Sequence, residues 1–374
     1  MMQAQHPLGD YLQSPALVPH TYNSRQWGSL LAANQHAPDL SVVQLAMIGT
    51  SPTPTDDKAI PSAADAVRQQ LYALYCSEAT LPLIDLGNIR ACPSPTDTHY
   101  ALAAVVEWLL QQGIVPIIIG ETAQQSLGQL RGHAAWSKKI QAALLMSQFD
   151  MTALPYLQQW LQHPQLTDLS LLAYQRAYTN PNDIDRLEKK LFDCCGLGEL
   201  RPDLQEIEPY LRHQHLLAFD LAAVRHADAP ATLHAPPAGL TAEEALSVVR
   251  YAGLSDHITS LGVYSYLPAL DHRQQTAQLV AQMIWYFVEG FNSRKNDLPE
   301  QDEKYYWRYI VNFKDHDHEV VFLKSKKTNR WWMRVPSTQA SKGYVLCPCS
   351  YNDYQIASHN EIPDRWLKAL LRWA

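Results

Sequence analysis

Long apolar runs and several signature motifs are missing from the 374-residue sequence. No apolar run approaches the roughly 18 residues that a membrane-spanning helix needs. There is no G-x-G-x-x-G, no P-loop and no G-x-S-x-G elbow, so nothing indicates a phosphate-binding loop or a serine hydrolase. The six cysteines form no C-x-x-C pair. We therefore expect free thiols and neither a disulfide framework nor a zinc site.

Excess positive charge is also absent. The chain has 30 Lys and Arg against 37 Asp and Glu, which gives a net charge of −7. This balance argues against a nucleic acid or an anionic membrane held by bulk charge. The first residues lack the basic and apolar regions of a secretory signal, so we expect a cytoplasmic protein without membrane insertion.

Short apolar runs alternate with helical patterns over most of the chain. Strands are predicted near residues 42–48, 81–86, 114–119, 140–146, 169–173, 216–221 and 258–264. Helices are predicted over 63–75, over 100–110 with Gly113 as its cap, from the capping box of Thr241 and Glu244, and over 275–289. This alternation predicts an α/β protein with a mostly parallel sheet covered on both faces.

The sequence pattern changes after the helix that ends near Gly290. A polar stretch from Asn292 to Glu303 reads as a linker, and three strands over 305–313, 319–324 and 331–335 read as a meander before a closing helix over 366–373. The predicted domains are therefore an α/β domain over 1–291 and a small β-rich C-terminal extension over 292–374. We expect the extension to pack on the core.

Polar side chains follow several of the predicted strands. In open parallel sheets the ligand site forms outside the carboxyl ends of the strands. The candidates at those ends are Glu121, Gln124, Gln148, Asp150, Asp220 and Ser265.

The order of these strand ends resembles the ureohydrolase superfamily, which comprises arginase, agmatinase and formimidoylglutamase. Five weak motifs carry the resemblance in the right order. The family's G-G-D-H-S, D-A-H-x-D, S-F-D-x-D, P-x-G-L-T-x-x-E and E-x-N-P-x-x-D motifs are similar to residues 120–124, 146–150, 218–222, 237–244 and 265–271. The resemblance implies a three-layer α/β/α arginase-like fold. The extension, with Arg330–Trp332 and Asp364–Trp366, is similar to a Bacteroidota branch labelled arginase or formimidoylglutamase.

The resemblance implies a site that this chain has largely lost. In the active family, two His and four Asp hold two Mn²⁺ ions, and the hydroxide between the ions attacks the carbon of a guanidinium or amidine. Four of these six positions fall on Ala123, Met146, Gln148 and Ala222, and only Asp150 and Asp220 remain. The glutamate that faces the substrate falls on Ser265.

We favour a ureohydrolase-fold pseudoenzyme without cofactor, which acts as a non-catalytic binding or scaffolding protein. The alternative is a rewired Mn²⁺-dependent hydrolase of C–N bonds in linear amidines such as formimidoylglutamate. Asp150 and Asp220 either cap local backbone, line a remnant pocket or rebuild a metal site with Glu121. Glu121 itself either joins such an acidic cluster, points to solvent or caps the following helix. A third hypothesis is an interaction subunit that binds a protein partner through the extension, and the family also assembles into homo-oligomers.

Histidines and tryptophans elsewhere offer further candidates. The tract Asp315–His318 reads as a solvated turn more readily than as a metal site, although it has the composition of one. His213 and His215 lie on one face of the chain before a strand, and His226 follows the Asp220 strand end. Alternation predicts that one ring of Trp331 and Trp332 points inward and that the other is exposed.

Overall fold

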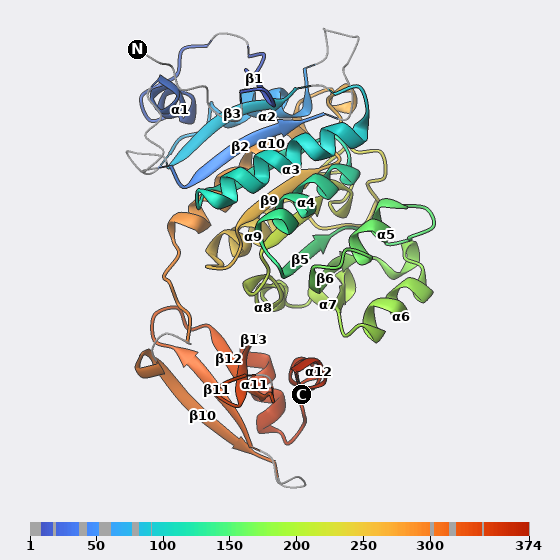
Figure 1. Cartoon of the computed structure of the whole chain (residues 1–374), viewed down its shortest axis with the longest axis vertical. Coiled ribbons are helices and arrows are strands. Elements are labelled where there is room, and N and C mark those ends of the chain that lie inside the picture. Colours follow the sequence, from blue (N-terminus) through green and yellow to red (C-terminus); the bar gives the residue numbers. More distant parts are fainter. Residues whose placement is uncertain are drawn as a thin grey trace.

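The computed structural model describes residues 9–17, 20–36, 43–51, 61–76, 82–90, 92–299, 303–313, 319–338 and 340–373. A large α/β body precedes a smaller extension, which lies at one end of the body (Figure 1). Within the described residues, no helix is long and apolar enough to cross a membrane.

A nine-stranded sheet forms the centre of the body. Its order is β1-β3-β2-β4-β9-β8-β5-β6-β7, and all pairs are parallel except the short β1 at one edge. The strands are β1 (Leu12–Gln13), β2 (Leu45–Thr50), β3 (Leu83–Ile89), β4 (Val115–Gly120), β5 (Ile140–Leu145), β6 (Leu166–Tyr174), β7 (Asp193–Gly196), β8 (Leu216–Asp220) and β9 (Ser260–Tyr264). The predicted parallel sheet is confirmed, and the short strands β1 and β7 were not predicted.

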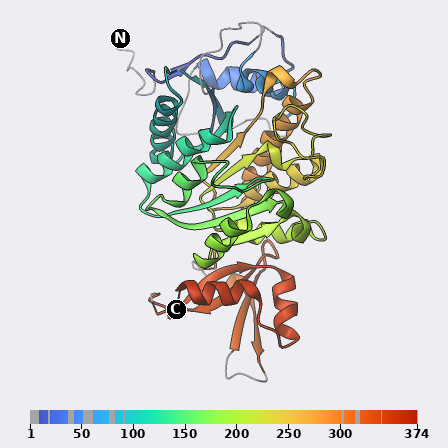
Figure 2. The ribbon, with the colours of Figure 1, turned by 90° about the vertical axis from the view of Figure 1, so that its right-hand side faces the viewer.

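Helices cover both faces of this sheet and bury two apolar layers (Figure 2). One face carries α1 (Trp27–His36), α2 (Ala63–Leu71), α7 (Leu197–Leu200), α8 (Ile207–Arg212), α9 (Ala242–Leu254) and α10 (Gln275–Asn292). The other carries α3 (Pro95–Gln111), α4 (Ser126–Trp136), α5 (Tyr156–Leu161) and α6 (Pro181–Lys189). The three-layer α/β/α expectation is therefore confirmed.

Local signals set the helix ends. Thr241 and Glu244 form the predicted capping box, in which the Thr241 Oγ1 accepts from the Glu244 N–H at 3.2 Å and the Glu244 carboxylate accepts from the Thr241 N–H at 2.7 Å. Gly113 has a φ of +72° just after α3, which suits a glycine. The predicted start of α3 at residue 100 is wrong, because Ser94 caps the helix and Pro95 occupies its first turn.

The extension contains a four-stranded antiparallel sheet and two helices. Its elements are β10 (Tyr306–Asn312), β11 (Glu319–Ser325), β12 (Trp331–Pro336), β13 (Tyr344–Cys349), α11 (Tyr351–Ser358) and α12 (Asp364–Trp373). The prediction of a three-strand meander is therefore wrong, because the sheet has a fourth strand, β13. The missed strand, β13, contains Pro348, which lowers strand propensity, and it is tolerated here because β13 is an edge strand.

Both rings of the Trp331–Trp332 pair are buried, so the prediction of one exposed ring is wrong. The two rings do lie on opposite faces of the sheet, as alternation requires. Trp331 stacks on Tyr354 of α11 with centroids 5.0 Å apart, whereas Trp332 faces the body, where the Arg212 guanidinium lies 4.5 Å from its ring centre. Each face of the small sheet is covered, which the sequence pattern of the strand alone does not reveal.

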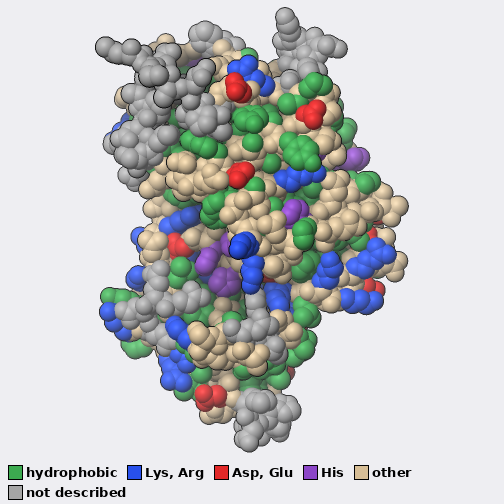
Figure 3. Space-filling model, viewed as in Figure 1, with side chains coloured by type: hydrophobic (Ala, Val, Ile, Leu, Met, Phe, Trp, Pro, Cys, Tyr) green, Lys and Arg blue, Asp and Glu red, His purple; other side chains and the backbone are tan. Residues whose placement is uncertain are grey.

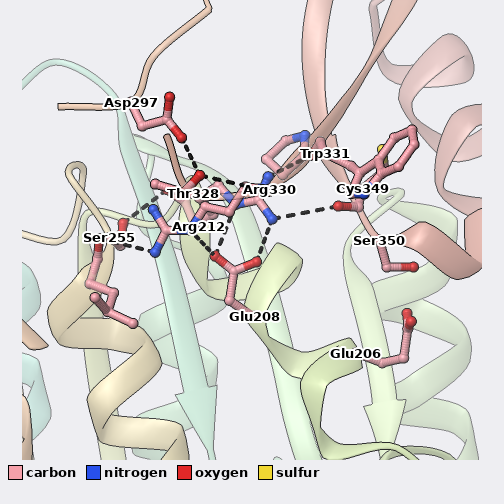
Figure 4. A network of polar contacts seen from close by, with 12 residues as sticks. Glu206, Glu208, Arg212, Ser255, Asp297, Thr328, Arg330, Trp331, Cys349 and Ser350 are labelled. Atoms are coloured by element: carbon pink, nitrogen blue, oxygen red, sulfur yellow. Dashed lines mark hydrogen bonds and ion pairs between the residues drawn. The ribbon is translucent and has the colours of Figure 1, made fainter. Parts of the chain in front are cut away.

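Buried charges join the extension to the body (Figure 4). The Glu208 carboxylate of α8 accepts from the Arg212 Nε at 3.0 Å and pairs with the Arg330 Nε at 3.1 Å. Arg212 also donates to the carbonyl oxygen of Trp331 at 2.6 Å. Burial opposes ionisation of Glu208, but the two guanidinium groups lower its pKa overall. The extension is thus anchored to the body through a desolvated ionic network.

Candidate functional site

A pocket of about 430 Å³ lies where β4, β8 and β9 end. We call it the site pocket. Five of the six candidate side chains line it, namely Glu121, Gln124, Gln148, Asp220 and Ser265, and so do Ala123 and Ala222. Met146 is instead buried in the apolar layer. The strand ends that the sequence singled out therefore meet around one cavity.

The loop after β4 is held by backbone and amide contacts. The Gln125 side-chain oxygen accepts from the N–H groups of Glu121 and Thr122 at 2.8 and 3.0 Å. Gly120 permits this approach, because a Cβ atom there would lie 2.7 Å from that oxygen. The Glu121 carboxylate accepts from the Ser51 hydroxyl at 2.7 Å and from the N–H of Ala63 at 3.2 Å. Glu121 therefore caps the start of α2, a helix that precedes it in the chain.

Asp150 serves the local backbone. Its carboxylate accepts from the N–H groups of Thr152 and Ala153 at 2.8 and 3.1 Å. It is not among the residues that line the site pocket. This arrangement is the capping role considered for Asp150, and it separates Asp150 from the other candidates.

Asp220, at the end of β8, is one of the two carboxylates that line the site pocket, and Glu121 is the other. Asp220 accepts from the N–H of Ala222 at 3.0 Å and caps the short 3-10 turn of residues 221–223. Burial raises the pKa of Asp220, although hydrogen bonds from Ala222 and Ser265 and the nearby His234 counteract the rise. Ser265 has a φ of +69°, a left-handed conformation that a side chain adopts at a cost. Asp220 is therefore inclined toward its neutral form compared with an exposed aspartate.

Tyr156 of α5 is a pocket residue that the sequence did not indicate. The residue is only 7% exposed and lines the site pocket. Its hydroxyl has no hydrogen-bond partner among the described residues. Burial, followed by the nearby Asp220, raises its pKa well above the ordinary value. No motif marks this tyrosine, because it lies in a short helix that contributes to the apolar layer.

The histidine candidates lie elsewhere. His226 is exposed and does not line the site pocket, whereas His234, which the sequence did not single out, does. His213 and His215 lie at the junction with the extension. The Asp315–His318 tract falls outside the described residues.

The donor set of the site pocket does not fit two Mn²⁺ ions. Hard divalent ions require several carboxylate or imidazole ligands, and paired ions require more. In the parts of the chain that the structure describes, no group of three or more His, Cys, Asp or Glu side chains is placed to hold a metal ion. Asp220 has alanine and glutamine around it where such ligands would stand, and the carboxylates of Asp150 and Glu121 are occupied by backbone and hydroxyl donors.

Comparison with known proteins agrees with this fold. The model of the arginase family matches residues 174–289. No curated protein matches the sequence.

Solved structures of the superfamily superpose over most of the body. Trypanosoma cruzi formiminoglutamase with Mn²⁺ has a TM-score of 0.63 at 18% identity, over 72% of this chain and 99% of its own. Bacillus subtilis formimidoylglutamase has a TM-score of 0.62 at 16% identity, over 76% of this chain and 98% of its own. Bacillus cereus arginase has a TM-score of 0.55 at 17% identity, over 68% and 100%. The chain therefore has an arginase-like fold, and its residues 174–289 match the arginase family, as the resemblance to the ureohydrolase superfamily implied.

Proposed function

We propose that this chain is a ureohydrolase-fold protein that has lost the binuclear manganese site and works by binding instead of catalysis. One observation carries the proposal. Four of the six positions that hold metal in the resembled family are Ala123, Met146, Gln148 and Ala222, and one of the two remaining carboxylates, Asp150, is turned to local backbone. Loss of even an outer-shell partner costs about 10–100-fold in metal affinity, so loss of four direct ligands should abolish binding.

The site pocket then serves an uncharged polar small molecule. Its polar side chains are mainly amides and hydroxyls, with Gln124, Gln148 and Ser265 among them. Asp220, with its raised pKa, and the Tyr156 hydroxyl, which has no partner among the described residues, add hydrogen-bonding capacity to the pocket. A buried hydroxyl without a partner costs about 1–3 kcal/mol, and a ligand that pairs with it recovers that cost.

The test is hydrolysis of formimidoylglutamate, arginine and agmatine with Mn²⁺ present. The proposal expects no release of formamide or urea above the uncatalysed rate. A restored variant that combines Ala123→His, Met146→Asp, Gln148→His and Ala222→Asp is the matched control, since it returns the missing ligands to the same backbone. Hydrolysis by the wild type that is lost in Asp220→Ala would contradict the proposal and support the amidine hydrolase instead.

The scaffolding part of the proposal places a protein partner on the extension. Among the described residues of the extension, the exposed aromatic rings are those of Tyr305, Trp307 and Tyr351, at 45%, 57% and 54% exposure, whereas Trp331 and Trp332 are buried. Large aromatic side chains are frequent anchors of protein interfaces. Trp307→Ala should remove a captured partner without changing the melting temperature. If this variant still binds the partner, Trp307 is not part of the binding surface.

A further inference from the structure

A second pocket, of about 250 Å³, lies between the body and the extension. We call it the junction pocket. The body contributes Asp168 near the start of β6, Asp193 at the start of β7 and the residues 213–215 before β8, while β13 and α12 of the extension contribute the facing wall. These are the amino ends of the parallel strands, so the junction pocket lies at the opposite edge of the sheet from the site pocket. Figure 2 shows α12 running along this junction.

Charges of both signs line the junction pocket. Arg372 pairs with Asp168 at 2.8 Å. Lys368 and Arg372 lie farther from Asp193, at 3.7 and 3.9 Å. Direct hydrogen bonds between such groups measure about 2.7–2.9 Å, so the contacts of Asp193 are ion pairs without a close bond. Asp193 and Lys368 are therefore held near each other without saturating each other.

The other basic groups of the pocket add no free charge. The Arg365 guanidinium is bound by Asp353 at 2.6 Å and by Glu206 at 3.1 Å. Burial lowers the pKa of His213 to about 4 and also lowers that of His215, so both rings are neutral at pH 7. Histidine side chains gather with Lys and Arg side chains around this junction (Figure 3). Two cations, Lys368 and Arg372, thus face two anions, Asp168 and Asp193, and the pocket is neutral overall.

Among the buried side-chain atoms of the pocket residues that have no hydrogen-bond partner in the described part of the chain, two are available to a ligand. They are the side-chain oxygen of Gln214, a residue that is 2% exposed, and the Nε of Arg365. The first is an acceptor and the second is a donor. Buried groups of this kind are normally satisfied, so a ligand that has both donors and acceptors would pair with both.

We propose that the junction pocket binds a small zwitterion of the α-amino-acid class. The ligand carboxylate lies toward Lys368 and Arg372, and its ammonium group lies toward Asp193 and the Gln214 oxygen. A neutral pocket built from unlike charges suits a ligand that carries both signs, because a simple ion would leave one of the pocket charges repelled or unpaired. The cavity volume suits a molecule of amino-acid size.

The experiment is calorimetric titration of the full chain at pH 7 with each protein amino acid singly, and with acetate, methylamine and inorganic phosphate as partial probes. At least one amino acid should bind with one site per chain, and each partial probe should bind at least about tenfold more weakly. Asp193→Asn and Lys368→Met should each weaken amino-acid binding at least about tenfold, since both remove a charge-assisted contact. The exposed Lys139→Met is the matched control and should leave binding unchanged.

Several outcomes would overturn the proposal. They are the absence of binding by every amino acid at millimolar concentration, acetate or phosphate that binds as tightly as the amino acid, and unchanged binding by Lys368→Met. Melting temperatures of all variants are measured in parallel, and Lys368 and Asp193 are chosen because their contacts are long. An Asp220→Ala variant should keep the junction binding, so this result is independent of the function proposed for the site pocket.

Discussion

The two pockets lie at opposite edges of one sheet and differ most in their charge. The site pocket, at the carboxyl ends of the strands, has two half-buried carboxylates, Asp220 and Glu121, among amides, hydroxyls and alanines. The junction pocket, at the amino ends, gathers Asp168, Asp193, Lys368 and Arg372 in a smaller volume. In the resembled family the first edge carries the metal ligands. Charged side chains of both signs therefore gather where the extension docks, whereas amides, hydroxyls and alanines make up much of the lining at the other edge.

The largest loss of unfolding free energy should come from breaking the ionic network of the junction. Glu208→Gln leaves the guanidinium groups of Arg212 and Arg330 buried without their carboxylate, and breaking a buried pair costs about 3–5 kcal/mol. Chemical denaturation should show this loss. The matched control is Glu199→Gln, whose pair with Arg176 is exposed and is expected to contribute at most about 1 kcal/mol. Equal losses in the two variants would contradict a structural role for the junction charges.

The next largest effect is a dependence of the folded protein's stability on pH, which arises from His213 at the junction. Burial lowers the pKa of His213 from 6.5 to about 4, so the unfolded chain takes up a proton at higher pH than the folded chain. Stability contributed by neutral His213 is present above pH 6.5 and is lost as the pH falls toward 4. Between these values the unfolding constant of the wild type should rise at least about tenfold more than that of His213→Gln.

The comparison between the wild type and His213→Gln is needed because Asp168 also changes its charge in this pH range. Burial raises the pKa of Asp168 to about 6, although Arg372 opposes the rise, so its contribution to stability falls as the pH rises from about 4 to 6. The two groups therefore act in opposite directions in the wild type, and the difference between the wild type and His213→Gln isolates the histidine. Parallel denaturation curves at every pH would show that His213 is not buried neutral in solution.

A smaller difference in stability is expected between Phe variants of two buried tyrosines of the body. The Tyr264 hydroxyl donates to the Gln129 side-chain oxygen at 3.0 Å, whereas the Tyr156 hydroxyl has no partner among the described residues. Tyr264→Phe should cost about 1 kcal/mol, while Tyr156→Phe should be neutral or stabilising by about 1 kcal/mol, because it removes an unsatisfied polar group. Thermal denaturation of the ligand-free protein measures both. A clear loss in Tyr156→Phe would mean that its hydroxyl is already paired in the protein.

The smallest effect is expected at Asp220. Because the pKa of Asp220 is raised in the folded protein, the wild type loses stability as the pH rises through that pKa. Asparagine cannot ionise, so the variant does not lose stability in this way. Asp220→Asn should therefore remain within about 1 kcal/mol of the wild type, and the difference should move in favour of Asn from pH 5 to pH 8. If the variant is strongly destabilised at pH 8, the ionised carboxylate has a partner in solution.

Much of this architecture could be predicted because it depends on local patterns. The capping box at Thr241 and the strand that ends at Asp220 lie where the sequence indicated. Strand ends of one parallel sheet meet at one edge, and five of the six candidates chosen there line one pocket, whereas Asp150 does not.

What the sequence did not reveal depends on contacts between distant elements. The strand β13 was missed because Pro348 argues against a strand unless the edge position is known. The burial of both Trp331 and Trp332 requires knowing that α11 and the body cover opposite faces. The junction pocket joins residues more than 150 positions apart, such as Asp193 and Lys368, and no local motif connects them.

The count of manganese ions per chain tests the central claim most directly. The purified chain and the restored four-residue variant are incubated with excess Mn²⁺, desalted and analysed for metal by mass spectrometry. We expect less than about one Mn²⁺ for every ten wild-type chains, because four of the six ligand positions lack a carboxylate or an imidazole. Two equivalents of Mn²⁺ retained by the wild type would contradict this expectation.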